Sequence, residues 1–201
     1  PGGFSYGDDL GAGKVQANEL ILKLSQEIVP FIERGGLVFG ACNGFQVLVK
    51  AGILPGPASC GQTATLTNND SGRFECRWVY LAANKKSRCV FTQDVGLIYV
   101  PVAHGEGKFV APPEVLDRVD VALYYADEQG NPCTAYPACP NGSMRAIAGI
   151  TDATGRVFGL MPHAEDHINR QQHPRWTRAM PNGAGNGLKI FQNAVAWVKK
   201  S

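Results

Sequence analysis

The sequence predicts an α/β fold, because helical and strand patterns alternate near its beginning and short β-type runs fill its middle. Apolar residues at helical spacing predict a helix over residues 15–33, and the glycine pair at 35–36 ends it. The continuously apolar run 37–39 is typical of a strand buried on both faces. A second helical pattern follows directly and is expected to end at Gly52.

The middle of the chain predicts strands rather than helices. Its apolar runs are short and rich in Val, Tyr and Phe, and turn clusters separate them. Two further runs flank a turn and predict a hairpin, and the end of the chain has the spacing of an amphipathic helix. The expected strands are 74–81, 90–91, 97–102 and 121–125, the hairpin strands are 146–151 and 157–161, and the last helix is 187–199.

Composition favours a single globular domain. The chain has 201 residues, of which 44% are hydrophobic and 18% charged, and this is enough apolar material for a hydrophobic core. The formal net charge of +2 is close to balance, which argues against nucleic acid or an anionic membrane as a partner. No stretch reaches the length of a membrane span, and no signal peptide is visible. The turn-rich opening, residues 1–9, leads us to expect an amino-terminal portion before it.

The cysteines do not form a metal-binding pattern. No pair has CxxC spacing and no paired-histidine motif accompanies them, so neither a zinc site nor any other metal site is predicted. Their dilution along the chain argues against a disulfide framework, which predicts reduced thiols and a cytoplasmic location. The six are Cys42, Cys60, Cys76, Cys89, Cys133 and Cys139.

Cys42 lies in a segment, Gly40–Gly44, that separates the apolar run 37–39 from the second helical pattern. A strand that turns sharply into a helix needs small residues on both sides of the turn, and the two glycines meet this need. Such an elbow presents the cysteine above the amino end of a helix, where the helix dipole favours a thiolate. The pattern alone leaves two interpretations open, a nucleophile and a buried structural cysteine.

His163 and Glu165 follow the second strand of the predicted hairpin. In an extended chain, residues two apart point the same way, so the two side chains can share one face. A carboxylate beside an imidazole orients the ring and raises its basicity, as a nucleophile and its base require. The alternative is a surface strand end with two polar residues.

Two glycine-rich segments have the character of ligand-binding loops. The stretch 104–107, His-Gly-Glu-Gly, follows an apolar strand, and its glycines allow the backbone to approach a ligand closely. Pro1–Gly3 could direct backbone N–H groups at an oxyanion. Ordinary turns are the alternative for both. His167 and His173, near the end of the chain, are expected to be exposed to solvent.

Six blocks of sequence resemble, in the same order, the glutaminase part of the phosphoribosylformylglycinamidine synthases. These proteins are a purine-pathway branch of the class I (triad) glutamine amidotransferases. The resemblance spans nearly the whole chain and implies that residues 1–201 are one class I glutamine amidotransferase domain, incomplete at its amino end. The blocks are PGGFSYGD (1–8), GACNGFQ (40–46), NDSGRFE (69–75), HGEG (104–107), PNGS (140–143) and MPHAE (161–165).

The fold that this resemblance implies is a flavodoxin-like, three-layer α/β domain with a mostly parallel sheet that lacks its amino-terminal strands. The sequence departs from the family pattern at Ala164, where proline usually stands between the histidine and the glutamate. The change removes no functional group, so the same site residues are expected.

The chemistry that the resemblance implies is glutamine hydrolysis. Cys42 would attack the side-chain amide, His163 would carry the proton from the thiol to the leaving ammonia, and Glu165 would orient His163. Backbone N–H groups of Gly3 and Asn43 would form the oxyanion hole. Water would then release glutamate from the thioester. The residues expected to bind glutamine are Gly2, Gln46, His104, Gly105 and Glu106.

The partner that the resemblance implies is a synthase subunit or domain, with a small bridging subunit in some systems. The ammonia would be channelled to that synthase, which converts formylglycinamide ribonucleotide to formylglycinamidine ribonucleotide in de novo purine biosynthesis. ATP and Mg²⁺ are expected in the synthase only, and this domain is expected to need no cofactor. Two alternatives remain at this point, a stand-alone cysteine hydrolase of the DJ-1/PfpI type and a catalytically silent docking module.

Overall fold

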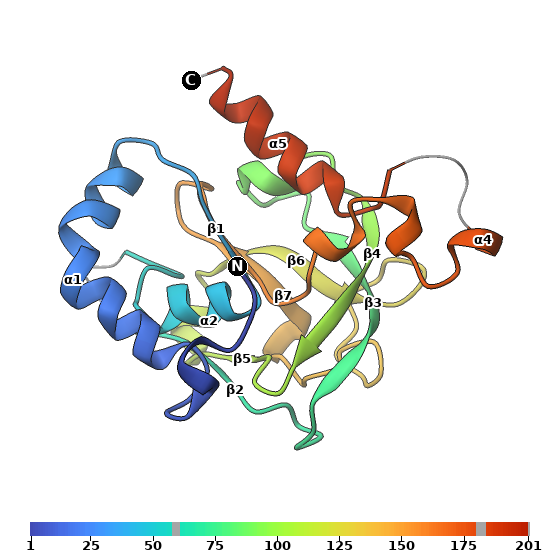
Figure 1. Ribbon diagram of the computed structural model, residues 1–201, viewed down its shortest axis with the longest axis horizontal. Helices are drawn as coiled ribbons and strands as arrows, with labels where there is room; N and C mark the ends of the chain where they lie inside the picture. The colour runs from blue at the N-terminus through green and yellow to red at the C-terminus, as the bar shows by residue number, and fades with distance from the viewer. Residues whose placement is uncertain (58–60, 180–183, 201) are drawn as a thin grey trace.

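The computed structural model describes residues 1–57, 61–179 and 184–200 (Figure 1). The strands in this part of the chain are β1 (Val38–Ala41), β2 (Thr65–Thr67), β3 (Glu75–Ala83), β4 (Leu97–His104), β5 (Lys108–Val110), β6 (Asp120–Ala126), β7 (Ile147–Thr151) and β8 (Val157–Leu160). The α-helices are α1 (Lys14–Glu33), α2 (Asn43–Lys50), α3 (Pro113–Leu116), α4 (Trp176–Ala179) and α5 (Leu188–Val198). Short 3-10 helices are η1 (Ser5–Asp8), η3 (Val90–Thr92), η4 (Met144–Ala146), η5 (Glu165–His167) and η6 (Arg170–Gln172).

The main sheet is mixed, which corrects the mostly parallel sheet that the family resemblance implied. Its strands are ordered β1-β8-β7-β6-β3-β4, and β2 pairs with β5 in a separate ribbon. Within the described residues, β1 and β8 run parallel and the other neighbouring strands run antiparallel. Three of the antiparallel pairs, β3–β4, β6–β7 and β7–β8, join strands that follow one another in the chain with no α-helix between them, so no crossover connection makes them parallel. The α/β class itself is confirmed.

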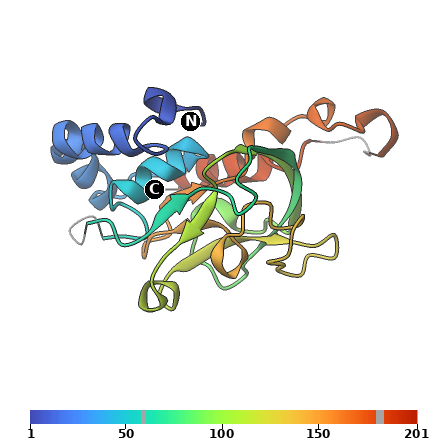
Figure 2. The ribbon, with the colours of Figure 1, turned by 90° about the horizontal axis from the view of Figure 1, so that it is seen from below.

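Two hydrophobic cores give the domain three layers. Helices α1 and α2 cover one face of the sheet, where Phe45 and Phe109 stack in the core (Figure 1). The other face is covered by α5 and η3, which pack on β1 and β8 around Phe39 and Phe158. The segment 90–91, expected as a strand, belongs to this second layer as part of η3. Figure 2 shows the amino terminus lying over α2, and Gly44 N–H donates a hydrogen bond to the carbonyl of Pro1.

The sheet curls so that its far edge approaches its first strands. β4 is separated from β8 by three strands in the sheet order. Nevertheless, the N–H of His163, just after β8, donates a 2.8 Å hydrogen bond to the carbonyl of Pro101 in β4. The thiol of Cys42, just after β1, lies 3.7 Å from the carbonyl oxygen of Ala103 in the same strand. The residues that follow β1, the residues that follow β8 and part of β4 therefore meet at the carboxyl ends of β1 and β8.

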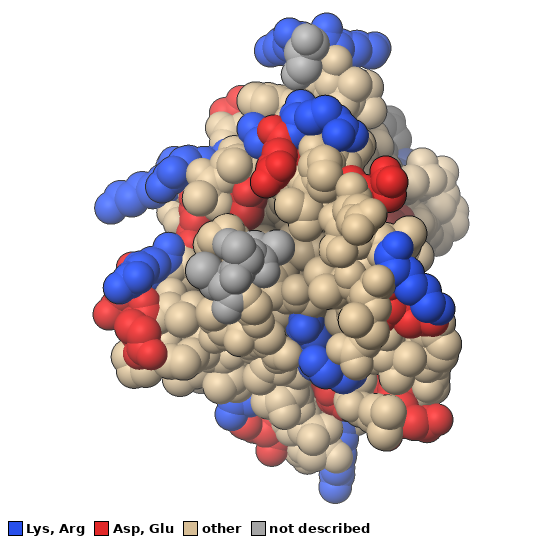
Figure 3. Space-filling model, turned by 90° about the vertical axis from the view of Figure 1, so that its left-hand side faces the viewer, with Lys and Arg blue, Asp and Glu red and all other residues tan. Residues whose placement is uncertain are grey.

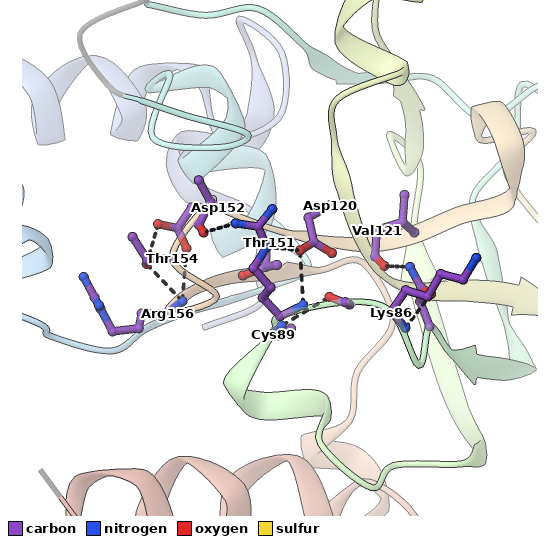
Figure 4. Close-up of polar contacts among 12 residues, drawn as sticks. Lys86, Cys89, Asp120, Val121, Thr151, Asp152, Thr154 and Arg156 are labelled. Atoms are coloured by element: carbon purple, nitrogen blue, oxygen red, sulfur yellow. Dashed lines mark hydrogen bonds and ion pairs between the residues drawn. The ribbon is translucent and has the colours of Figure 1, made fainter.

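The predicted hairpin is present as β7 and β8. Its turn is held by the Asp152 carboxylate, which accepts hydrogen bonds from the N–H groups of Arg156 and Val157 (Figure 4). The hydroxyl of Thr154 donates to the same carboxylate at 2.7 Å. This turn sets the pairing register of β7 with β8, and the end of β8 lies beside the end of β1.

The surface and the tail complete the fold. Positive and negative side chains are interspersed over the face on the α1 side (Figure 3). No helix among the described residues is both long and apolar enough to span a membrane. His167 and His173 are buried against Trp78, so the prediction that they are exposed to solvent was wrong. Their rings fill a space between β3 and the tail that the sequence pattern did not reveal.

Candidate active site

Cys42 lies at a sharp turn between β1 and α2. Its backbone is left-handed, with φ 50° and ψ −106°, which is unusual for a residue with a side chain. Strain of this kind persists only where the surrounding structure enforces it. Here Cys42 N–H is held by a 2.7 Å hydrogen bond to the carbonyl of Leu160 at the end of β8. The side chain is 4% exposed.

Gly40, on the strand side of Cys42, is required by close backbone contacts. A Cβ atom added to Gly40 would lie 2.6 Å from the carbonyl carbon and oxygen of Gly44 and 2.7 Å from the side chain of Leu48. The strand and the helix could not approach so closely with any other residue there. The sequence-based interpretation of Gly40–Gly44 as a tight strand-to-helix elbow is therefore borne out by the geometry.

His163 and Glu165 are in contact at the carboxyl end of β8. Nδ1 of His163 donates a 2.7 Å hydrogen bond to Oε1 of Glu165. The expected extended backbone is absent, because Ala164 has helical angles (φ −67°, ψ −29°) and Glu165 begins η5. A turn therefore makes the contact that a strand was expected to make. With Nδ1 engaged, Nε2 of His163 is buried and has no hydrogen-bond partner among the described residues.

The parallel pairing of β1 with β8 brings Cys42 and His163 to one place. Ala41 is in register with Leu160, so the residues that follow each strand emerge at the same edge of the sheet. Gly2 fits between the two side chains: a Cβ atom added there would lie 2.6 Å from Cε1 of His163 and 3.5 Å from Cβ of Cys42. One small residue thus contacts both.

The pKa values of His163 and Glu165 move apart. Burial alone would lower the pKa of His163, but interaction with Cys42 and with the Glu165 carboxylate outweighs burial and raises it to about 10. Burial raises the pKa of Glu165, and hydrogen bonding to His163 reverses this and leaves it below its usual range. The charged forms of the pair stabilise each other, which favours an imidazolium beside a carboxylate.

Two backbone N–H groups near Cys42 have no acceptor among the residues that the structure describes. Asn43 is the first residue of α2, where an N–H has no partner inside the helix. Gly3 has φ +133°, a conformation that L side chains rarely adopt. Neither N–H donates a hydrogen bond within the part of the chain that the structure describes. Both are therefore free to donate to an oxyanion.

A cavity of about 190 Å³ opens beside Cys42. This is smaller than the sites that take drug-sized ligands and is of a size suited to an amino acid. Five residues that the sequence predicted for the site, besides Cys42, line it: Gly3, Gln46, His104, Gly105 and Glu106. Gly2 instead lies against His163 and lines the adjoining apolar groove.

Gln46 connects the elbow to the loop 104–107. Its Oε1 accepts a hydrogen bond from the Asn43 side chain at 3.0 Å, and its Nε2 donates to the carbonyl of Glu106 at 2.7 Å. The side chain is 3% exposed. Gln46 therefore fixes the wall of the cavity, and both of its polar atoms are engaged.

Asn69 holds the other side of the same loop, and the sequence interpretation missed this role. Its Oδ1 accepts from Gly107 N–H and pairs with Nδ1 of His104, both at 3.0 Å, while its Nδ2 donates to the carbonyl of His104. Burial lowers the pKa of His104 to about 4, so its ring is neutral. Only the position of Asn69 at the start of the NDSGRFE block (69–75) could have indicated it.

The Glu106 carboxylate faces the loop before α1. Oε2 accepts a hydrogen bond from Ala12 N–H at 3.1 Å and lies 3.5 Å from Nζ of Lys50, which also donates to the carbonyl of Ala12. Lys50 is nearly buried and was not expected at the site. Of the cysteines, Cys60 lies outside the described residues, and the other five are free thiols. The described residues contain no cluster of side chains able to hold a metal ion.

Comparison with known proteins agrees with this geometry. A family model described as a CobB/CobQ-like glutamine amidotransferase domain matches residues 1–198. The chain belongs to this glutamine amidotransferase family. The match covers both the elbow and the segment that carries His163.

Relatives of this amidotransferase carry a more specific name. This chain is 56% identical over 200 residues to the phosphoribosylformylglycinamidine synthase subunit PurQ of Dehalococcoides mccartyi, and the match covers 100% of this chain and 78% of the relative. The subunit of the same name from Methanococcus maripaludis is 40% identical over 217 residues, covering 100% of this chain and 79% of the relative. A solved structure of PurLQS from Thermotoga maritima matches with a TM-score of 0.73 and 36% identity, over 98% of this chain and 77% of the other.

Proposed function

We propose that this amidotransferase is the glutaminase component of a phosphoribosylformylglycinamidine synthase and that it forms a glutamyl thioester on Cys42. One observation supports the cysteine mechanism above all: the strained elbow of β1 and the His163–Glu165 pair meet at the paired ends of β1 and β8. The names of relatives up to 56% identical favour a synthase subunit over a stand-alone hydrolase or a silent module.

The reaction starts with attack of the Cys42 sulfur on the side-chain amide carbon of glutamine. The amide oxygen becomes an oxyanion, and the N–H groups of Gly3 and Asn43 donate hydrogen bonds to it. His163 takes the thiol proton on Nε2 and passes it to the departing nitrogen, which leaves as ammonia. Water then adds to the thioester, and glutamate leaves as the thiol regains a proton. The balance is glutamine plus water to glutamate plus ammonia.

Glu165 acts through His163. Its hydrogen bond to Nδ1 leaves Nε2 as the atom that exchanges a proton with sulfur. The raised pKa of His163 favours the protonated ring, which is the form that stabilises a thiolate and protonates the departing amide nitrogen. Gln46 and Asn69 keep the loop 104–107 in place as the wall of the glutamine site.

The ammonia passes to a synthase partner. The solved relative is titled as a PurLQS structure, and we extend such an assembly to this chain. The synthase uses ATP and Mg²⁺ to convert formylglycinamide ribonucleotide to formylglycinamidine ribonucleotide, and the glutaminase needs no cofactor of its own. Free thiols fit a cytoplasmic location. Residues 1–201 act as one amidotransferase domain.

The decisive experiment compares the wild-type protein with Cys42→Ala in complex with its synthase. We expect glutamine-dependent ammonia release to be lost in the variant, while ammonia supplied directly still supports product formation. Cys76→Ala, which removes an exposed thiol on β3, is the matched control and should keep full activity. Ammonia release that survives Cys42→Ala would refute the nucleophile assignment.

A further inference from the structure

Asp8 is a carboxylate that the mechanism above does not use. It ends η1 and lines the same 190 Å³ cavity as Cys42, Gln46 and His104. Its Oδ1 atom is buried and has no hydrogen-bond partner among the described residues. A buried carboxylate oxygen without a partner is costly, so its presence at a ligand cavity calls for a ligand that would pair with it.

The backbone holds Asp8 in this place by strain. Three consecutive residues, Tyr6, Gly7 and Asp8, have left-handed φ values of 55°, 67° and 57°. The carbonyl of Asp8 accepts a hydrogen bond from Gly11 N–H at 2.9 Å, which closes the turn. Left-handed backbone at residues other than glycine costs free energy and is concentrated at functional sites. The position of the carboxylate is therefore imposed by the fold.

Of the other polar side chains that line the cavity, Gln46 and Glu106 are already engaged, and Asn68 is exposed. Nε2 of His104 is also buried without a partner among the described residues, but the ring carries no charge. Gln46 uses both ends of its amide, and the ring of His104 is neutral with Nδ1 bound to Asn69. The Glu106 carboxylate is paired with Ala12 N–H and with Lys50. Burial is the main cause that raises the pKa of Asp8, and Glu106 adds to it, while a hydrogen bond from Gly13 N–H and the charge of Lys50 oppose the rise. A ligand cation in the cavity would stabilise the ionised Asp8 carboxylate further.

We propose that Asp8 binds the α-ammonium group of the substrate glutamine and so selects an amino acid over a simple amide. This inference rests on the proposed glutaminase function. Glutamine carries its reacting amide and its ammonium on one short molecule, and the cavity offers Cys42 for the first and Asp8 for the second. A charge-assisted hydrogen bond of this kind contributes to binding rather than to the chemical step.

The test uses two chloroketone probes with the full chain in its synthase complex. One is the chloroketone analogue of glutamine, in which the Cys42 sulfur displaces chloride, and the other is its desamino counterpart. The rate of labelling of Cys42 by each is followed by intact mass and peptide mapping. In the wild-type protein we expect the amino-bearing probe to react at least about tenfold faster. Asp8→Asn should remove this preference while leaving the desamino rate within about twofold.

Asp9→Asn is the matched control, since it removes the neighbouring exposed carboxylate, which does not line the cavity. We expect it to keep the wild-type preference. The Asn side chain retains a hydrogen-bond acceptor for the nearby Gly13 N–H, and equal melting temperatures would show that the turn is intact. A preference that persists in Asp8→Asn, or equal slowing of both probes, would overturn the subsite. Failure of the glutaminase proposal looks different: neither probe would label Cys42 in the wild-type protein.

Discussion

His163 and Glu165 form a 2.7 Å hydrogen bond across a turn, and the backbone of Ala164 between them is helical. The turn bends the chain away from β8 into η5, so the carboxylate reaches Nδ1, and Nε2 has no hydrogen-bond partner within the described part of the chain. A substitution that keeps this shape but removes the charge of Glu165 therefore tests orientation and electrostatics separately from folding.

Glu165→Gln should lower kcat for glutamine hydrolysis by about a hundredfold or more, because the amide no longer stabilises the protonated ring and can enforce the wrong tautomer. Steady-state ammonia release by the synthase complex measures this. Asp166→Asn is the control, since Asp166 lies 3.9 Å from Nδ1 and is largely exposed. An equal loss in both variants would contradict a specific role for Glu165.

Gly2→Ala should impair catalysis without unfolding the protein. The new Cβ atom would lie 2.6 Å from Cε1 of His163, so the ring must move away from Cys42. Displacement of a catalytic group by about 1 Å costs up to about a hundredfold in rate. We expect kcat to fall by at least about tenfold with an unchanged melting temperature. Gly96→Ala, whose Cβ meets no atom within 4 Å, should behave like the wild-type protein.

Gly40→Ala should destabilise the fold itself. Its Cβ would lie 2.6 Å from the backbone of Gly44, and backbone atoms cannot step aside as a flexible side chain can. Overpacking of this kind costs about 2 kcal/mol or more. Denaturant unfolding measures the change, again with Gly96→Ala as the reference. Unchanged stability would mean that β1 and α2 are farther apart than described.

His104 predicts a specific pH dependence of stability. Its pKa is lowered from 6.5 to about 4 by burial, so between these pH values the unfolded chain binds a proton that the folded protein does not. Stability should therefore fall as the pH drops from 6.5 towards 4. In His104→Gln this loss should be smaller, and above pH 6.5 the two proteins should depend on pH in parallel. Identical slopes on the acid side would contradict the buried neutral ring.

Much of the fold followed from local pattern. The helices α1, α2 and α5 and the hairpin of β7 and β8 lie close to their predicted ranges, because apolar periodicity and glycine stops are local signals. The prediction of a strand at 90–91 was wrong, because two apolar residues fit a 3-10 helix as well as a strand. The elbow was predicted correctly because steric demand at Gly40 is expressed in the sequence itself.

The arrangement around the site could not be derived in the same way. The curl that brings Pro101 and Ala103 to His163 and Cys42 depends on twist accumulated over several strands, and no local pattern encodes it. Asn69 acts through hydrogen bonds to a loop 35 residues away. Turn geometry, not strand alternation, joins His163 to Glu165. The sequence predicted which residues to consider for the site, but not the backbone geometry that brings them together.

The curl of the sheet also decides when the reactive thiol acquires its partners during folding. The contact of Cys42 with Ala103 spans 61 residues of chain, and the base arrives only with the segment after β8. Contacts between distant segments are slow to form, because closing a long loop costs conformational entropy before the contacts can stabilise the chain. A nascent or partly unfolded chain therefore carries an ordinary cysteine. Under the proposed function, the reactivity of Cys42 depends on these long-range contacts, so we expect it in the folded protein and not in the unfolded chain.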